Sequence, residues 1–166
     1  MFFKKFFIII FLLTFSFSTF ANTPRSTGKS KNWESFTAET DEGKICFAQT
    51  SPTKRAPAAV KREKSKLFVT FRPSENINNE VSLTSGHEYK TSTVTARSGK
   101  RSYSFFSKDR FAWILDDQEE KKFIQLMKKA TDVIVKARTS KGAETTDHYS
   151  MMGFTKAYNT AKKNCS

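Results

Sequence analysis

The sequence predicts a mainly β fold, an antiparallel β-sandwich (immunoglobulin-like) with two peripheral amphipathic helices. About eight short runs of β-branched and aromatic residues are separated by turns that contain Gly or Pro. Two further segments place their apolar residues at helical spacing instead. The chain has 166 residues, a length that allows one domain and little else.

The first 21 residues have the features of a secretory signal peptide. Lys4 and Lys5 precede the apolar run Phe6–Leu13. In Thr19-Phe20-Ala21, which ends the segment, small residues occupy the two positions that a signal peptidase reads. We expect cleavage after Ala21; a retained signal anchor is the alternative, although the apolar run is shorter than the roughly 20 residues that span a bilayer. The expected organisation is a signal peptide at 1–21, a flexible polar segment at 22–31 and one domain at 32–166.

Cleavage would remove nearly half of the phenylalanines of the chain but almost none of its positive charge. Eight of the 17 Phe lie in residues 1–21, but only two of the 29 basic residues do. The remaining 145 residues would carry 27 basic and 16 acidic side chains, a net charge of +11. The mean hydropathy excludes a multi-span membrane protein, and nothing in the composition predicts an activity or a cofactor.

The strands are expected in sequence from residue 32. The first hairpin joins 32–40 to 44–50 through Asp41-Glu42-Gly43, with Gly43 at a positive φ. The run at 65–72 ends at Pro73, which cannot continue a ladder. Further strands are expected at 80–84, 92–97, 101–107, 111–115 (a buried strand), 131–139 and 143–151.

The two helices are expected at 116–130 and 153–163. Asp116 and Glu119 have the spacing of a capping box, and Lys128 and Lys129 lie in the last turn, where they favour the helix dipole. Each helix has one apolar face. The residues of these faces are Phe123, Ile124, Met127 and Ala130 in the first helix, and Phe154, Ala157, Tyr158 and Ala161 in the second.

The chain has two cysteines, Cys46 and Cys165, both outside the signal peptide. An even number of cysteines in an exported chain indicates a disulfide, and two allow only one pairing. The alternative is a catalytic or metal-binding thiol. A CxxC pair or a neighbouring His would favour that alternative, and the sequence has neither.

The C-terminal third carries the most specific motif of the chain. The motif runs Thr145-Thr146-Asp147-His148-Tyr149-Ser150, then Gly153-Phe154-x-x-Ala157-Tyr158 and Cys165. The features that precede it in the sequence are, in order, Trp33, the hairpin with Cys46, Arg72-Pro73, Tyr103–Phe106 and Phe111–Trp113. This order resembles the invasion-associated locus B family of alphaproteobacterial exported proteins over residues 30–166. The resemblance implies a periplasmic or envelope domain with a sandwich-like fold, and it does not imply invasion.

Catalytic and metal sites find little support in the sequence. Ser150, His148 and Asp147 contain the residue types of a hydrolase triad, but neighbouring strand residues point to opposite faces and no GxSxG elbow is present. His87 and His148 lack the spacing of a zinc site. The acidic residues at 116–120 are better explained by the helix start than by a glycosidase pair. Asp147 is expected to be a buried hydrogen-bond or ion-pair anchor, with a ligand contact as the alternative.

The segment 53–66 is expected to be a long exposed basic loop. Its cations create a potential that attracts anions, so we expect a non-enzymatic envelope protein that contacts an anionic component; a solvated surface without a partner is the alternative. Charge reversal at Lys61, Arg62 and Lys64 should then abolish binding without lowering the melting temperature. The candidate anion-binding residues are Lys54, Arg55, Lys61, Arg62, Lys64 and Lys66.

Two further expectations concern partners and location. Nucleic acid is not expected as a partner, because the aromatic residues alternate with core positions and would leave no exposed stacking platform. No metal or cofactor is expected. A secreted or surface-exposed factor that interacts with host cells is the alternative to a periplasmic envelope protein.

Overall fold

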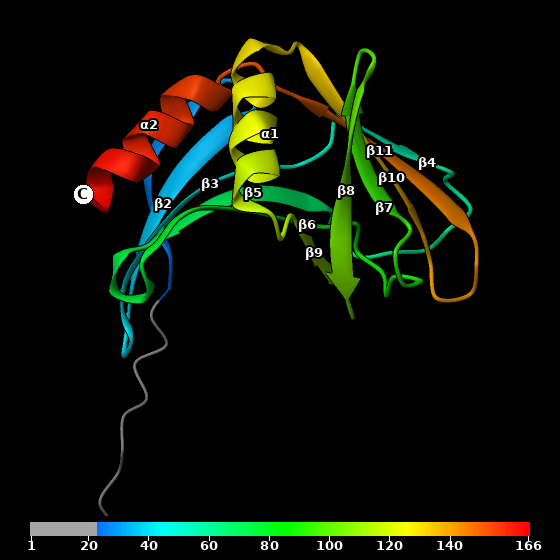
Figure 1. Cartoon of the computed structure of the whole chain (residues 1–166), viewed down its shortest axis with the longest axis horizontal. Coiled ribbons are helices and arrows are strands. Elements are labelled where there is room, and N and C mark those ends of the chain that lie inside the picture. The colour runs from blue at the N-terminus through cyan, green and yellow to red at the C-terminus, as the bar shows by residue number, and fades with distance from the viewer. Residues whose placement is uncertain (1–22) are drawn as a thin grey trace, which may run out of the picture.

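The computed structural model describes residues 23–166 as a strongly bent antiparallel sheet with two helices on its inner side (Figure 1). The predicted signal peptide lies outside the described residues. The strands are β1 (Arg25–Ser30), β2 (Trp33–Thr40), β3 (Gly43–Thr50), β4 (Lys54–Ala56), β5 (Lys66–Arg72), β6 (Ile77–Thr84), β7 (Val94–Ser98), β8 (Arg101–Lys108), β9 (Phe111–Trp113), β10 (Asp132–Arg138) and β11 (Glu144–Ser150). The helices are α1 (Asp117–Lys129) and α2 (Phe154–Asn164), with a 3₁₀ turn at Pro73–Glu75.

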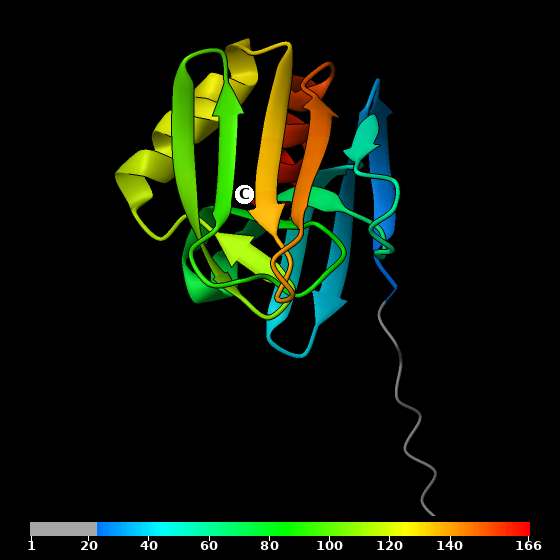
Figure 2. The same cartoon turned by 90° about the vertical axis from the view of Figure 1, so that its right-hand side faces the viewer.

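The described strands form one sheet in the order β1-β2-β3-β5-β6-β9-β8-β7-β10-β11-β4. The sheet bends at β9, so that β7, β8, β10 and β11 stand as a second layer beside the first (Figures 1 and 2). Most neighbours in the sheet are neighbours in sequence, because short turns connect them. This arrangement confirms the predicted mainly β, sandwich-like fold with antiparallel strands and two helices.

Hydrogen bonds between the start of β2 and the end of β11 join the two layers on the side away from the bend at β9. The Asn32 N–H donates to the Met152 carbonyl at 3.2 Å, and the buried Trp33 indole N–H donates to the Ser150 carbonyl at 2.9 Å. Gly153 lies beside this contact with φ at +94°, and a Cβ there would lie 1.8 Å from the Ser30 carbonyl oxygen. Only glycine therefore allows α2 to begin so close to the end of β1.

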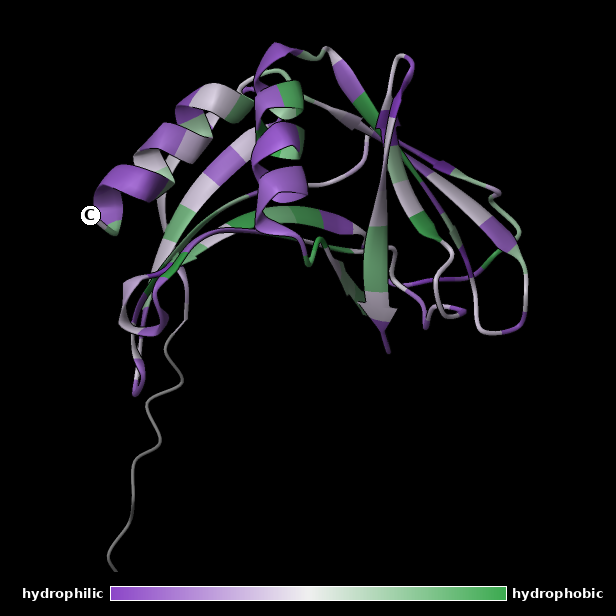
Figure 3. Cartoon of the chain, viewed as in Figure 1, coloured by the Kyte–Doolittle hydropathy of each residue, from purple (hydrophilic) through white to green (hydrophobic). Residues whose placement is uncertain are grey.

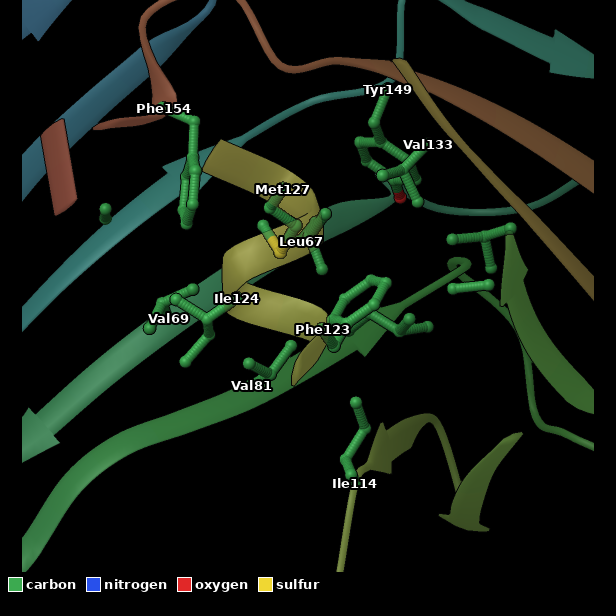
Figure 4. Packing of buried hydrophobic residues seen from close by; sticks show 14 of the residues in the cluster. Leu67, Val69, Val81, Ile114, Phe123, Ile124, Met127, Val133, Tyr149 and Phe154 are labelled. Carbon is green, nitrogen blue, oxygen red and sulfur yellow. The ribbon is translucent and has the colours of Figure 1, made fainter. Parts of the chain in front are cut away.

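The core lies between the two layers and is completed by the helices. Phe123 of α1 is fully buried and lies in this core with Ile124 and Met127 of the same helix (Figure 4). The centroid of its ring lies 5.0 Å from that of Tyr103 and 5.6 Å from that of Phe105. Phe154 of α2 packs 4.7 Å from Trp33 in the same way. The helices expose their hydrophilic faces, and the strands alternate between apolar and polar residues (Figure 3). The predicted apolar faces of both helices are thus the faces that enter the core.

The local features that the sequence predicted are largely present. The Asp116 carboxylate accepts the Glu119 N–H at 2.8 Å and caps α1. Gly43 has φ at +118° in the first hairpin, although the turn itself contains only two residues because Gly43 already pairs with Thr40. Cys46 and Cys165 form the predicted disulfide, which ties β3 to the end of α2.

Four expectations about exposure and order are wrong. Residues 25–30 of the supposedly flexible segment form β1, which pairs with β2 along most of its length. Residues 54–56 form β4 within the expected loop. The run at 111–115 is not a buried strand, since Leu115 is 72% exposed. Exposed aromatic side chains were not expected, yet they occur on the outer face of the sheet, where Phe106 is 48% exposed. The strands concerned carry aromatic residues on both of their faces, and only one face enters the core.

One carboxylate of α1 points toward the sheet rather than into solvent. Glu120 accepts a hydrogen bond of 2.6 Å from the Val81 N–H. Burial raises the pKa of Glu120 to about 7, and the negative charges of Glu80 and Asp117 act in the same direction. The folded protein therefore holds this proton more tightly than the unfolded chain does, so Glu120 lowers stability as pH rises from about 4.5 to 7.

Glu120→Gln is expected to stabilise the protein above pH 7 and to have little effect near pH 4. Glutamine keeps an acceptor for Val81 and removes the charge. Because the carboxylate is only about half buried, solvent screening reduces the gain to about 1 kcal/mol. Thermal unfolding of both proteins between pH 4 and 8 measures it. A difference in melting temperature that does not vary with pH would contradict the assignment.

Candidate anion-binding site

The segment 53–66 is fixed to the body of the protein at several points. β4 pairs with β11, where Arg55 lies opposite Asp147. The Glu63 N–H donates to the Gly86 carbonyl at 2.9 Å. Gly86 has φ at +75°, and a Cβ there would lie 2.2 Å from the Glu63 carbonyl oxygen, so the close approach requires glycine. The segment is thus an ordered part of the second layer and not a free loop.

Arg62 is the buried anchor of this segment. Its guanidinium holds the Asp147 carboxylate with two contacts, Nη1 to Oδ2 at 2.9 Å and Nη2 to Oδ1 at 2.7 Å. The side chains of Arg62 and Asp147 are 3% and 1% exposed. Arg62 also donates to the carbonyls of Ser85 and Ala56. Asp147 is therefore the ion-pair anchor that the sequence predicted, but its partner was expected on the surface.

Polar side chains around Asp147 form a buried network. His87 Nε2 lies 2.9 Å from Thr145 Oγ1, and the Tyr89 hydroxyl donates to Ser85 Oγ at 3.0 Å. Burial lowers the pKa of His87, and the positive charges of Arg62 and Arg55 lower it further. His87 is thus neutral at neutral pH, as its packing requires. Thr145 and Asp147 therefore both have partners within the protein.

The six candidate anion-binding residues differ in their exposure and in the partners that they have. Arg62 is fully engaged with Asp147, and Arg55 is partly engaged, since its guanidinium donates to the Glu63 carbonyl and lies 3.9 Å from Asp147. Lys54, Lys61 and Lys64 are exposed, and Lys66 is half-buried. The proposed reversal of Arg62 is therefore wrong as a test of binding, because it would break a buried ion pair.

The structure brings Lys66 together with two lysines from the segment that was expected to be flexible. Lys29 of β1, Lys31 and Lys66 line one cavity of about 360 Å³. None of the three has a carboxylate within 4.0 Å in residues 23–166. Glu34 is the one acid in the lining, and its carboxylate accepts the Ser26 hydroxyl at 2.6 Å. The cavity therefore has a net charge of +2 and suits a compact anion.

A larger cavity of about 630 Å³ lies between the segment 53–66 and the turn after β10. Lys61 and Lys141 line it, but so do Glu63 and Glu88. Arg110, also in the lining, forms an ion pair with Glu63. Arg62 completes the charged lining, so the net charge of this cavity is also +2. Arg62 and Arg110 are held in ion pairs with Asp147 and Glu63, however, which leaves two lysines without an ion pair in residues 23–166. This cavity is therefore less suited to an anion than the lysine pocket formed by Lys29, Lys31 and Lys66, where three cations lack an ion pair.

Sequence reasoning missed Lys29 and Lys31 because a polar segment without apolar alternation gives no sign of a strand. The two lysines are separated by one residue, which places them near each other in any extended chain. That spacing alone does not reveal Lys66, which is 35 positions further along the sequence. The pairing of β1 with β2, of β2 with β3 and of β3 with β5 is what brings the three together.

The residues considered for catalysis are not assembled into a site. Asp147 is buried on one face of β11, whereas His148 and Ser150 lie on the other. Of the acids at the start of α1, Asp116 caps the helix and Glu120 binds a backbone N–H. Within residues 23–166, no group of three or more His, Cys, Asp or Glu side chains could hold a metal ion. None of the helices in that range is both long and apolar enough to cross a membrane.

Fold and site together define a small, disulfide-bonded antiparallel β protein with a positively charged pocket. Comparisons with models of protein families, with curated proteins and with solved structures found no match.

Proposed function

We propose that this chain is an exported, non-enzymatic envelope protein that binds an anionic component through its lysine pocket. The observation that carries the proposal is the convergence of Lys29, Lys31 and Lys66 on one cavity, with no carboxylate of residues 23–166 in ion-pair distance of them. Holding three unpaired cations together is unfavourable by itself, and a bound anion offsets that repulsion. The disulfide is consistent with an oxidising compartment.

The charge of the segment 53–66 supports the same interpretation. Lys54, Lys61 and Lys64 are exposed on the same segment that leads to Lys66. Such cations raise the local concentration of anions without fixing their geometry. The volume of the pocket suits a single headgroup, such as the phosphate of a phospholipid, better than an extended chain. The resemblance to the invasion-associated locus B family supports an envelope location.

The triple variant Lys29→Glu, Lys31→Glu, Lys66→Glu is expected to lose about 100-fold in affinity for phosphatidylglycerol vesicles. Each lysine near an anionic surface contributes about 1 kcal/mol. Cosedimentation with these vesicles and with neutral phosphatidylcholine vesicles measures the effect. Binding of the unmodified protein should also weaken as salt rises.

The matched control reverses three exposed lysines on the second layer, Lys100, Lys108 and Lys136. It changes the net charge equally but leaves the pocket intact, so we expect less than a threefold loss. Equal losses in both triple variants would mean that total charge, and not the pocket, determines binding. Full binding by the pocket variant would refute the proposal.

A further inference from the structure

The outer face of the first layer carries a groove that the lysine pocket does not involve. It has a volume of about 570 Å³ and lies across β3, β5, β6 and β9. Its walls are aromatic rings, those of Phe47 and Phe68 on one side and of Phe111 and Trp113 on the other. Phe111 is 45% exposed, and its ring stacks near Trp113 at 6.1 Å between centroids. These rings do not enter the core, because they alternate with the buried residues of the same strands.

The floor of the groove is made of hydroxyl groups. Ser82 lies opposite Phe68 on one side and opposite Trp113 on the other, so a hydroxyl is flanked by two rings in one row of the sheet. Thr70 lies opposite Phe47 in the next row. Two strand spacings, roughly 10 Å, separate the flanking rings.

Ser82 presents a hydroxyl to the groove that no described side chain engages. It is 7% exposed and lines the groove, yet its hydroxyl makes no side-chain hydrogen bond within residues 23–166. Because this oxygen still reaches solvent through the groove, a ligand hydroxyl can hydrogen-bond to it without breaking a bond within the protein. An acyl chain or an apolar peptide would instead cover the hydroxyls of Ser82 and Thr70 with carbon.

The charges of the groove cancel. Arg72 and Glu80 are the charged residues of its lining, and the guanidinium donates to both Glu80 oxygens at 3.1 and 2.9 Å. Arg72 also contacts Glu75 at 2.9 Å. The groove therefore offers no unpaired cation to a phosphate backbone, which a single-stranded nucleic acid would need besides stacking rings. The paired groups still present donors and acceptors to neutral hydroxyls.

We propose that this groove binds a neutral oligosaccharide. Pyranose rings with equatorial substituents have faces of C–H bonds, which suit the electron-rich faces of aromatic rings, and edges of hydroxyls, which suit Ser82, Thr70 and the Arg72–Glu80 pair. The alternation of rings and hydroxyls along the groove matches both features of such a sugar. A carbohydrate site of this kind is independent of the anion pocket.

Calorimetric titration with cellotetraose, a neutral β-1,4-linked glucose tetramer, tests the proposal. We expect saturable binding by the unmodified protein and a loss of about tenfold in affinity for both Phe68→Ala and Trp113→Ala. Trp113→Phe keeps an aromatic face and should stay within threefold of the unmodified protein. Met152→Ala is the control, since Met152 is 58% exposed but does not line the groove.

Several outcomes would overturn the assignment. These are no saturable binding, equal affinity in the alanine variants, dimerisation that those variants abolish, or salt-sensitive binding of a single-stranded oligonucleotide that requires Trp113. The pocket variant Lys29→Glu, Lys31→Glu, Lys66→Glu should bind cellotetraose normally, so failure of one site is distinguishable from failure of the other.

Discussion

Replacing Arg62 by methionine is expected to lower the free energy of unfolding by about 3–5 kcal/mol. The substitution leaves the Asp147 carboxylate buried at 1% exposure without its close partner, since Arg55 is 3.9 Å away. It also removes the donors that the carbonyls of Ser85 and Ala56 use. Urea unfolding measures the loss.

Arg138→Met provides the matched control. Arg138 forms an ion pair with Glu144, but both side chains are about half or more exposed, so less than 1 kcal/mol is expected. The double variant Arg62→Met, Asp147→Asn leaves no uncompensated buried charge and should recover part of the loss. An Arg62→Met protein as stable as the Arg138→Met protein would contradict the role of Arg62 as an anchor.

Removal of the disulfide is expected to lower the free energy of unfolding by about 4–5 kcal/mol. Cys46 and Cys165 are 119 positions apart, and closing so long a loop restricts the unfolded chain strongly. The bond also holds the end of α2 against β3. Guanidinium unfolding of the oxidised protein, the reduced protein and the Cys46→Ala, Cys165→Ala variant measures the loss. An unchanged midpoint after verified reduction would show that α2 is held by packing alone.

Features that depend on neighbouring residues were predictable from the sequence. The cap at Asp116, the turn at Gly43 and the apolar faces of both helices each rest on spacings of a few residues. The disulfide was predictable for a different reason, because two cysteines allow only one pairing. None of these required knowledge of the strand order.

Features that depend on distant partners were not predictable. Arg62 lies in a run of cations, and such runs are usually solvated; its partner Asp147 is 85 positions away. β1 contains no apolar side chain to alternate with its polar ones, and nearly all of its residues are exposed on both faces of the strand. The aromatic groove was missed for the opposite reason. Its rings alternate as core residues do, and only the position of the helices shows which face of the sheet is inside.

The two edge strands of the sheet, β1 and β4, both carry basic residues. β1 and β4 each leave one edge without a strand partner among residues 23–166. An open edge can pair with the edge of another molecule and start aggregation. β1 carries Arg25 and Lys29, and β4 carries Lys54 and Arg55. Like charges on both open edges repel approaching copies, so the cations that give the surface its positive potential also oppose edge-to-edge assembly of the protein with itself.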